Sequence, residues 1–228
     1  MKILGMGNAL VDVLARIDRD DILNELELPK GSMQLIDWDR LQRLNQMLEN
    51  TSKHIASGGS AANTITAMSK LGIPCGFLGK VGEDSYAQHF ENDLDKYGVK
   101  SHLIKDSQPS GIATTFISPD GERTFGTYLG AAAMLDANEV DEKIFDGYTH
   151  FYIEGYLVQS IELIRKAIST AKSKGLKVIL DLASYNVVDA NKDFLLEIIP
   201  QYIDIVFAND EEAQSLLGLA PDSAVDAL

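Results

Sequence analysis

Cysteine is nearly absent from this chain of 228 residues, in which Cys75 has no second cysteine to pair with. A disulfide within the chain is therefore excluded, which is typical of a reducing compartment, and we expect a cytoplasmic protein. No run of about 18 apolar residues occurs, so no membrane span is expected. The apolar start reaches Asp12 early and has no cleavage-like site. It therefore predicts a buried first strand and not a signal peptide.

Basic residues are also scarce, with 20 Lys and Arg against 34 Asp and Glu and a net charge of -14. Such a surface repels phosphate backbones, which excludes nucleic acid as an expected partner. ATP is not excluded, because a local cluster of backbone N–H groups can hold phosphate on an acidic protein. The contents of apolar residues (45%) and charged residues (24%) are those of an ordinary globular protein.

Predicted strands and helices alternate along most of the chain. Strands are expected at 2–6, 75–81, 149–153, 177–182 and 203–208, and helices at 41–48, 60–71, 84–97 and 160–174. This alternation predicts an α/β fold with a mostly parallel central sheet, helices on its faces and right-handed crossovers. In the second helix, one apolar stripe holds Ala61, Ala62, Ile65, Met68 and Leu71.

One region interrupts the alternation. Two β-rich runs within 110–128 are joined by Pro119-Asp120-Gly121, which predicts a hairpin. Short strand-like runs also occur within 13–37. We expect these pieces to form a small separate sheet that acts as a lid over a site. The alternative is an edge extension used for packing or for dimer contact.

The segment SGGSAANTITAMSKLG places two glycines before a helix. Gly58 and Gly59 have no Cβ, so the backbone can approach a ligand closely, and the helix start offers free N–H donors. Asn63 has both a donor and an acceptor, which suits a pair of sugar hydroxyls. A Gly-rich turn into a packed helix is an equally good interpretation of this segment alone.

The segment GMGNALVDV resembles the start of a dinucleotide fingerprint, but Leu10 stands where a third glycine belongs. This mismatch argues against a nicotinamide-dependent oxidoreductase. Asn8 and Asp12 instead follow the first strand, at the edge where open α/β sheets bind ligands. An aspartate there could accept hydrogen bonds from two hydroxyls, or it could be an exposed charge.

Three further positions carry carboxylates at strand ends. In FANDEEA, Asn209 and Glu212 have the spacing of a capping box, although Glu212 could also organise Mg²⁺ through water near phosphates. Glu154 follows a strand and precedes a glycine, so it could contact a substrate or be a solvated charge. Asp181, with Asn186 nearby, could face the same cleft or cap a turn.

Taken together and in order, these segments resemble the PfkB family of carbohydrate and nucleoside kinases. GMGNALVDV is similar to the family's opening strand, SGGSAANTITAMSKLG to its first signature, SGIATTFISPDGERTF to its lid strands and FANDEEA to its Asn-x-x-Glu motif. LDLASYNVV and YLGAAA look closer to the adenosine kinase-like branch.

The resemblance implies a ribokinase-like three-layer fold, with lid strands from about 13–37 and 110–128 inserted in one domain that spans 1–228. It implies an ATP- and Mg²⁺-dependent phosphotransferase acting on a primary hydroxyl of a sugar or nucleoside. The implied substrate contacts are Asn8, Asp12, Gly58, Gly59, Asn63 and Glu154. The implied phosphate and Mg²⁺ residues are Asn209 and Glu212.

The family's second signature, a Gly-Ala-Gly-Asp helix start that supplies the catalytic base, does not occur in this sequence. We therefore expect the base beyond Leu228, with the chain as printed being the N-terminal part of a longer protein. GLAPDSAVDAL, which reads as the first turns of a helix, supports that expectation. A non-catalytic sugar- or nucleoside-binding module is the alternative. The particular substrate stays open, as does the choice between a monomer and a homodimer paired through the lid.

Overall fold

The computed structural model describes residues 1–218. The helix predicted in the segment after Gly218 lies outside the described residues. Among residues 1–218, no helix is long and apolar enough to cross a membrane.

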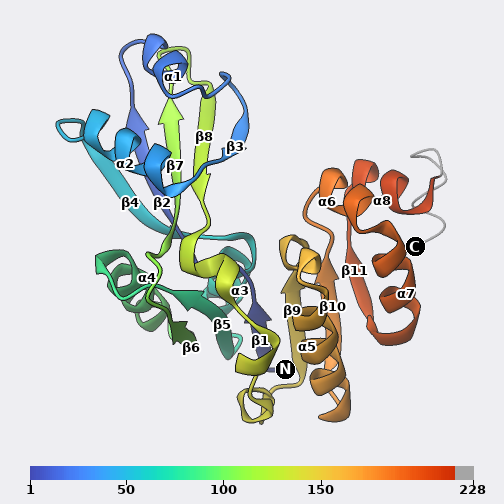
Figure 1. Ribbon diagram of the computed structural model, residues 1–228. Coiled ribbons are helices and arrows are strands. Elements are labelled where there is room, and N and C mark those ends of the chain that lie inside the picture. The colour runs from blue at the N-terminus through green and yellow to red at the C-terminus, as the bar shows by residue number, and fades with distance from the viewer. Residues whose placement is uncertain (219–228) are drawn as a thin grey trace.

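Within the described chain, six parallel strands form the central sheet (Figure 1). Their order is β11-β10-β9-β1-β5-β6, and each neighbouring pair is parallel. The bounds are β1 Ile3–Met6, β5 Cys75–Val81, β6 Lys100–Lys105, β9 His150–Glu154, β10 Lys177–Asp181 and β11 Ile205–Phe207. Because the strands are parallel, the segments that follow β1, β9, β10 and β11 all leave the sheet at one edge.

Helices cover both faces of this sheet, which confirms the predicted three layers. On one face, α3 (Ser60–Lys70) and α4 (Ser85–Lys96) pack on Ile3 and Phe77. On the other, α5 (Ile161–Ser173) and α7 (Lys192–Tyr202) pack on Leu4 and Leu78. Neighbouring residues of a strand point to opposite faces of the sheet. Ile3 and Phe77 therefore pack against one helix layer, and Leu4 and Leu78 against the other.

Two details of the predicted helices are wrong. Leu71 was expected on the apolar stripe of α3, but the helix ends at Lys70 and Leu71 is 81% exposed. Gly72, with φ +85, then carries the chain away in a conformation that favours glycine. Ser160 stands at the N-cap of α5, but its side chain makes no capping hydrogen bond.

The lid is a second, five-stranded mixed sheet within the described residues, with the order β3-β8-β7-β2-β4. The bounds are β2 Leu10–Arg16, β3 Met33–Leu35, β4 Lys53–Gly58, β7 Gly111–Ile117 and β8 Arg123–Tyr128. The predicted hairpin is confirmed, since β7 and β8 are antiparallel and Gly121 turns between them with φ +88. Strand β4 was not predicted from the sequence.

Two helices, α1 (Asp21–Glu25) and α2 (Trp38–Met47), cover one face of the lid (Figure 1). Val13 and Phe116 pack there against Leu41 and Leu44. The opposite face carries Leu10, Asp12 and other residues of even number in β2, because strand side chains alternate.

The remaining segments are short. They are the helices α6 (Tyr185–Ala190) and α8 (Asp210–Leu217) and the 3₁₀ turns η1 (Gly130–Met134), η2 (Ala137–Glu139), η3 (Glu142–Phe145) and η4 (Gly155–Gln159). Of these, η1 carries the chain from the lid strand β8 back towards the central sheet.

Candidate functional site

A cavity of about 490 Å³ lies between the lid and the edge where β1 and β9 end. Its polar lining includes Asn8, Gly59, Ser60 and Glu154. Its apolar lining comes from the lid, from η1 with its flanking residues and from α6, and includes Leu10, Met33, Leu35, Leu129, Leu135 and Val187. This cavity is therefore polar at the sheet edge and apolar towards the lid.

Glu154 joins three segments at the polar end. Its Oε1 accepts hydrogen bonds from the backbone N of Asn8 at 2.9 Å and from Asn8 Nδ2 at 2.6 Å. Its Oε2 accepts one from the backbone N of Ala61 at 3.0 Å. Glu154 thereby fixes the Asn8 side chain and the first turn of α3.

Glu154 is only 1% exposed, and burial raises the pKa of its carboxyl above the ordinary value, although the hydrogen bonds from Ala61 and Asn8 act in the opposite direction. A carboxylate with both oxygens already bound is well suited to holding other groups in place. Its predicted contact with substrate stays a prediction.

Gly58 and Gly59 are both crowded by their neighbours, and glycine is required most clearly at Gly59. Gly59 has φ +90, and a Cβ added there would overlap the carbonyl oxygen of Asn8. A Cβ added to Gly58 would overlap the Asp12 carboxylate. The structure thus brings Asn8, Gly59 and Glu154 together in the cavity wall and places Asp12 beside Gly58, although neither Asp12 nor Gly58 lines the cavity itself.

Asp12 differs from Glu154 because its carboxylate accepts no hydrogen bond from the described residues. It is half-buried on β2, and no group of residues 1–218 donates a hydrogen bond to it. Burial alone raises the pKa of its carboxyl. A desolvated carboxylate without partners is costly to keep, and two hydroxyls of a ligand could satisfy it.

Asn63 lies apart from this group. It is in the first turn of α3, where its backbone N donates to the carbonyl of Gly59 at 3.0 Å, but its side chain is exposed. It lines a smaller groove of about 150 Å³, next to residues such as Asp93 and Tyr97, and not the larger cavity. The structure therefore does not place Asn63 in the cavity wall.

Asn209 and Glu212 form the predicted capping box at the start of α8. Asn209 Oδ1 accepts from the N of Glu212 at 2.9 Å, and the backbone N and Nδ2 of Asn209 donate to the two oxygens of Glu212 at 2.9 and 3.0 Å. With both oxygens so bound, Glu212 fits an indirect role through water better than direct metal ligation. Within residues 1–218, no cluster of three or more His, Cys, Asp or Glu is arranged to hold a metal.

Asp181 is also engaged by the protein. It accepts from the Tyr152 hydroxyl at 2.8 Å and from the backbone N of Ala183 at 3.0 Å. Burial raises the pKa of Tyr152, whose hydroxyl is the donor in this bond. Asn186, in contrast, lines the cavity.

The apolar wall was not predicted from the sequence. Met33 and Leu35 are 53% and 61% exposed, which is unusual for large apolar residues on a strand. Leu129 and Leu135 flank η1, whose small residues come from the run YLGAAA. That run was noted in the sequence, but nothing in it indicated a cavity wall.

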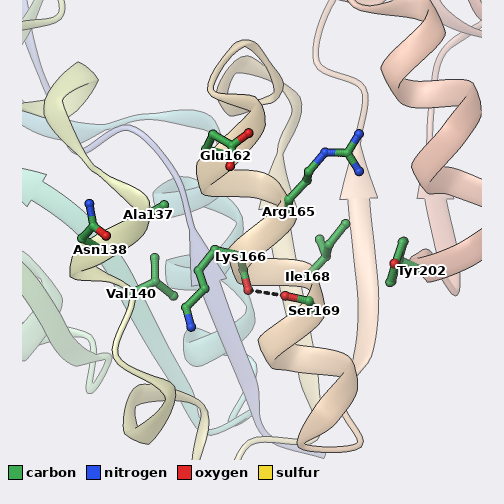
Figure 2. A pocket seen from close by; sticks show the side chains of 9 residues that line it. All are labelled: Ala137, Asn138, Val140, Glu162, Arg165, Lys166, Ile168, Ser169 and Tyr202. Carbon is green, nitrogen blue, oxygen red and sulfur yellow. Dashed lines mark hydrogen bonds between the residues drawn. The ribbon is translucent and has the colours of Figure 1, made fainter.

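A larger and more open groove of about 630 Å³ lies over the outer side of α5 (Figure 2). It contains none of the predicted site residues. Arg165, at its rim, is held by Glu197 through two hydrogen bonds of 2.7 Å. The groove lies on the helix layer, away from the strand ends, so we assign the site to the 490 Å³ cavity.

Comparison with known proteins identifies the family. The model of the pfkB family carbohydrate kinases matches residues 30–228. The chain belongs to this family. It is also 28% identical to the guanosine-inosine kinase of Escherichia coli K12, over 98% of this chain and 56% of that protein.

Among solved structures, an adenosine kinase from Sinorhizobium meliloti matches with a TM-score of 0.84 and 32% identity, over 99% of this chain and 70% of that one. A probable sugar kinase from Rhizobium etli matches with a TM-score of 0.85 and 30% identity, over the same shares. These two structures confirm the ribokinase-like fold. The chain spans 56% of the length of the guanosine-inosine kinase it matches.

Proposed function

We propose that this chain forms the substrate-binding part of an ATP-dependent kinase that phosphorylates a primary hydroxyl of a sugar or nucleoside. One observation carries the proposal, namely the 490 Å³ cavity at the carboxyl ends of parallel strands with polar groups at one end. The names of its relatives, which are nucleoside and sugar kinases, agree with it. They do not favour the non-catalytic binding module.

A nucleoside suits the cavity better than a free sugar. Asn8 and Gly59 offer hydrogen-bonding groups at the sheet edge, whereas Met33, Leu35 and Leu129 form the apolar wall. A flat base would cover that wall and remove it from water, but a free sugar would leave it exposed.

Each predicted contact has a role in this proposal. Asp12 would accept hydrogen bonds from two sugar hydroxyls, while Asn8 and the backbone at Gly58 and Gly59 would complete the grip. Asn63, which lines the separate smaller groove, would join them only after closure of the lid. Such positioning supplies much of the rate enhancement in phosphoryl transfer. Closure of the lid would exclude water from the transferring group.

The phosphates and their ion would lie near α8. Mg²⁺, when bound with ATP, neutralises phosphate charge, and we assign Glu212 an indirect contact with it through water. Asn209 would hold the Glu212 carboxylate, as it does in the capping box. The base would be the predicted Asp of the second signature, which the printed sequence does not contain.

A substrate panel tests the proposal. Guanosine, inosine and adenosine should each be titrated against the protein beside ribose and fructose. We expect saturable binding of at least one nucleoside and weaker binding of both sugars. Tighter binding of ribose, or no binding of any nucleoside, would contradict the assignment.

A turnover assay addresses the predicted base. The 228-residue chain should phosphorylate none of these compounds with ATP. Turnover by it would show that the base is misplaced. A longer form of the protein with the second signature should be active, and persistent inactivity there would favour the binding module.

We also infer a cytoplasmic location from the single buried Cys75. Assembly as a monomer or as a homodimer through the lid stays a prediction. Because α1 and α2 already cover one lid face, a dimer would have to use the other face or an edge strand.

A further inference from the structure

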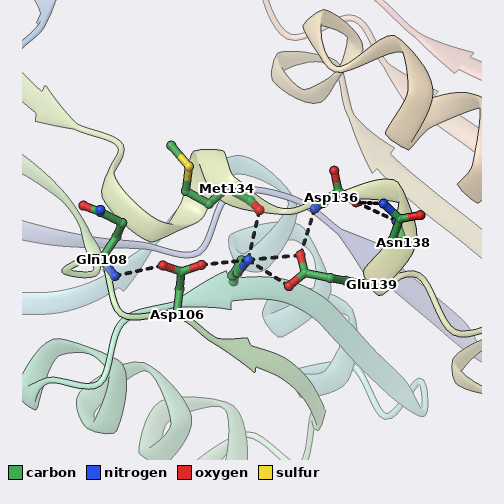
Figure 3. A network of polar contacts seen from close by, with 7 residues as sticks. Asp106, Gln108, Met134, Asp136, Asn138 and Glu139 are labelled. Atoms are coloured by element: carbon green, nitrogen blue, oxygen red, sulfur yellow. Dashed lines mark hydrogen bonds and ion pairs between the residues drawn. The ribbon is translucent and has the colours of Figure 1, made fainter.

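A buried lysine, Lys80, lies on the central sheet among residues of the connections to the lid. Figure 3 labels its partners Asp106, Met134 and Glu139. Lys80 is the last residue but one of β5, and its side chain is 7% exposed. Its Nζ lies 2.8 Å from Asp106 Oδ2 and 2.8 Å from Glu139 Oε1. It also donates to the carbonyl of Met134 at 3.0 Å.

These partners belong to the two connections that carry the lid hairpin. Asp106 follows β6 and begins the connection into β7. Met134 and Glu139 lie on the connection that returns from β8. The connections also touch each other, since the N of Ala131 donates to the carbonyl of Pro109 at 2.8 Å.

The returning connection is also a wall of the cavity. Leu129, Ala132, Ala133 and Leu135 line it, and the carbonyl that Lys80 binds, that of Met134, lies between the last two. Glu139 is held in turn by the backbone N of Asp136 at 2.9 Å. The ammonium group therefore fixes the backbone behind the apolar wall.

Two charged partners hold the Lys80 ammonium in spite of its burial. Burial lowers the pKa of the Lys80 ammonium, but hydrogen bonds to Asp106 and Glu139 outweigh it, so the pKa lies above its ordinary value. Removing the ammonium would leave two carboxylates facing each other in a partly dry site, which is much costlier than removing an exposed pair.

We propose that Lys80 is a positioning residue that clamps both lid connections to β5 and so holds the wall from Leu129 to Leu135 in place for the substrate. This inference rests on the proposed function for its ligand, but the clamp itself is a property of the chain.

The test is Lys80→Met, which keeps the aliphatic stem, with Lys105→Met as the matched control. Lys105, the last residue of the neighbouring strand β6, forms a single ion pair at 2.8 Å with Glu91 of α4, and its side chain is 41% exposed. Hydrogen exchange of backbone amides and titration with guanosine, inosine and adenosine are measured well below the unfolding temperature. Hydrogen exchange reports local opening of a segment separately from global unfolding.

For Lys80→Met we expect exchange to rise about tenfold or more at 106–110 and 129–139, with β9 and β10 unchanged, and nucleoside affinity to fall about tenfold. Lys105→Met should change neither. Saturating nucleoside should restore protection of 129–135 in Lys80→Met, because coupling between ligand and wall is reciprocal.

Uniformly faster exchange over the whole chain, or unchanged affinity in a folded variant, would overturn the proposal. If Lys80→Met does not fold, Glu139→Gln removes the negative charge of one partner and should give the same local pattern at smaller amplitude; an unchanged pattern would overturn the clamp. If the wild-type protein binds no nucleoside, the proposed function fails, and the exchange pattern alone decides whether the clamp exists.

Discussion

Glu154 and Asp12 both contact the segment Gly58–Ala61, Glu154 at Ala61 and Asp12 at Gly58, but their carboxylates differ in their hydrogen bonds. Glu154, at the end of β9, accepts three hydrogen bonds from Asn8 and Ala61. Asp12, on the lid strand β2, receives none from residues 1–218. Burial raises the pKa of both.

The difference separates two kinds of polar residue at one site. A carboxylate that the protein itself satisfies contributes to the architecture, and its loss should be seen in stability. A desolvated carboxylate without a donor costs stability and is retained for what binds it. Mutations at the two positions should therefore change different measurements.

The largest effect is expected for Glu154→Ala. It leaves the N of Asn8, the Nδ2 of Asn8 and the N of Ala61 without an acceptor, so the free energy of unfolding should fall by about 3 kcal/mol. Urea unfolding measures this. Glu162→Ala, on the exposed side of α5, is the control and should change stability by less than about 0.5 kcal/mol. A similarly small change for Glu154→Ala would remove the contrast between the two carboxylates.

Asp12→Asn should weaken nucleoside binding by about 10- to 100-fold, since a charged acceptor of hydrogen bonds is lost. Stability should rise at the same time. The folded protein holds the Asp12 proton more tightly than the unfolded chain does. The wild type therefore loses stability as pH rises through the raised pKa, and Asp12→Asn escapes that loss.

Thermal unfolding at two pH values checks the sign. The excess stability of Asp12→Asn over the wild type should be larger at pH ~7 than at pH ~3.5. Asp95→Asn, on the exposed side of α4, serves as the control. An advantage of Asp12→Asn that grows as pH falls would mean that Asp12 is stabilised in the fold, as an engaged carboxylate would be.

Glu212→Gln tests whether an engaged carboxylate can also serve the phosphates. Gln can still act in a capping box, so stability should change by less than about 1 kcal/mol, the typical value of a whole cap. In an active form of the protein, the Mg²⁺ concentration for half-maximal activity should rise. Glu211→Gln, on the same helix, should leave it unchanged. An unaltered Mg²⁺ profile for Glu212→Gln would mean that Glu212 acts only in the capping box.

Asn63→Ala is expected to have the smallest effect. Its exposed side chain makes no hydrogen bond with residues 1–218, so stability should change by less than about 0.5 kcal/mol. If the side chain reaches the ligand when the lid closes, nucleoside affinity should fall about fivefold, as for one neutral hydrogen bond. An unchanged affinity would mean that Asn63 does not contact the ligand and belongs only to the smaller groove beside Asp93.

Local signals in the sequence predicted much of the fold. The Asn209 and Glu212 spacing predicted a capping box, which the structure confirms, because such a motif is complete within four residues. The Pro119-Asp120-Gly121 turn predicted its hairpin for the same reason. The glycine pair before α3 was predicted to let the backbone approach a ligand closely, which stays a prediction; its close neighbours in the protein are Asn8 and Asp12.

Contacts between residues far apart in the sequence could not be predicted. Glu154 binds residues 146 and 93 positions away, so its sequence neighbours could not show whether it was satisfied or free. The apolar wall combines β3 with η1 and its flanking residues, which lie about a hundred positions apart in the sequence. The burial of the charged Lys80 likewise depends on Asp106 and Glu139, which are distant in the sequence. Strand β4 was missed because its residues, KHIASG, do not alternate clearly between apolar and polar.

A crystal structure of the protein with a bound purine nucleoside tests the central claim most directly. We predict that the ribose binds at Asn8, Gly59 and Asp12, with two hydroxyls on the Asp12 carboxylate, and that the base lies against Met33, Leu35 and Leu129. A nucleoside bound elsewhere, such as in the groove over α5, or one whose ribose leaves Asp12 without a partner, would contradict it.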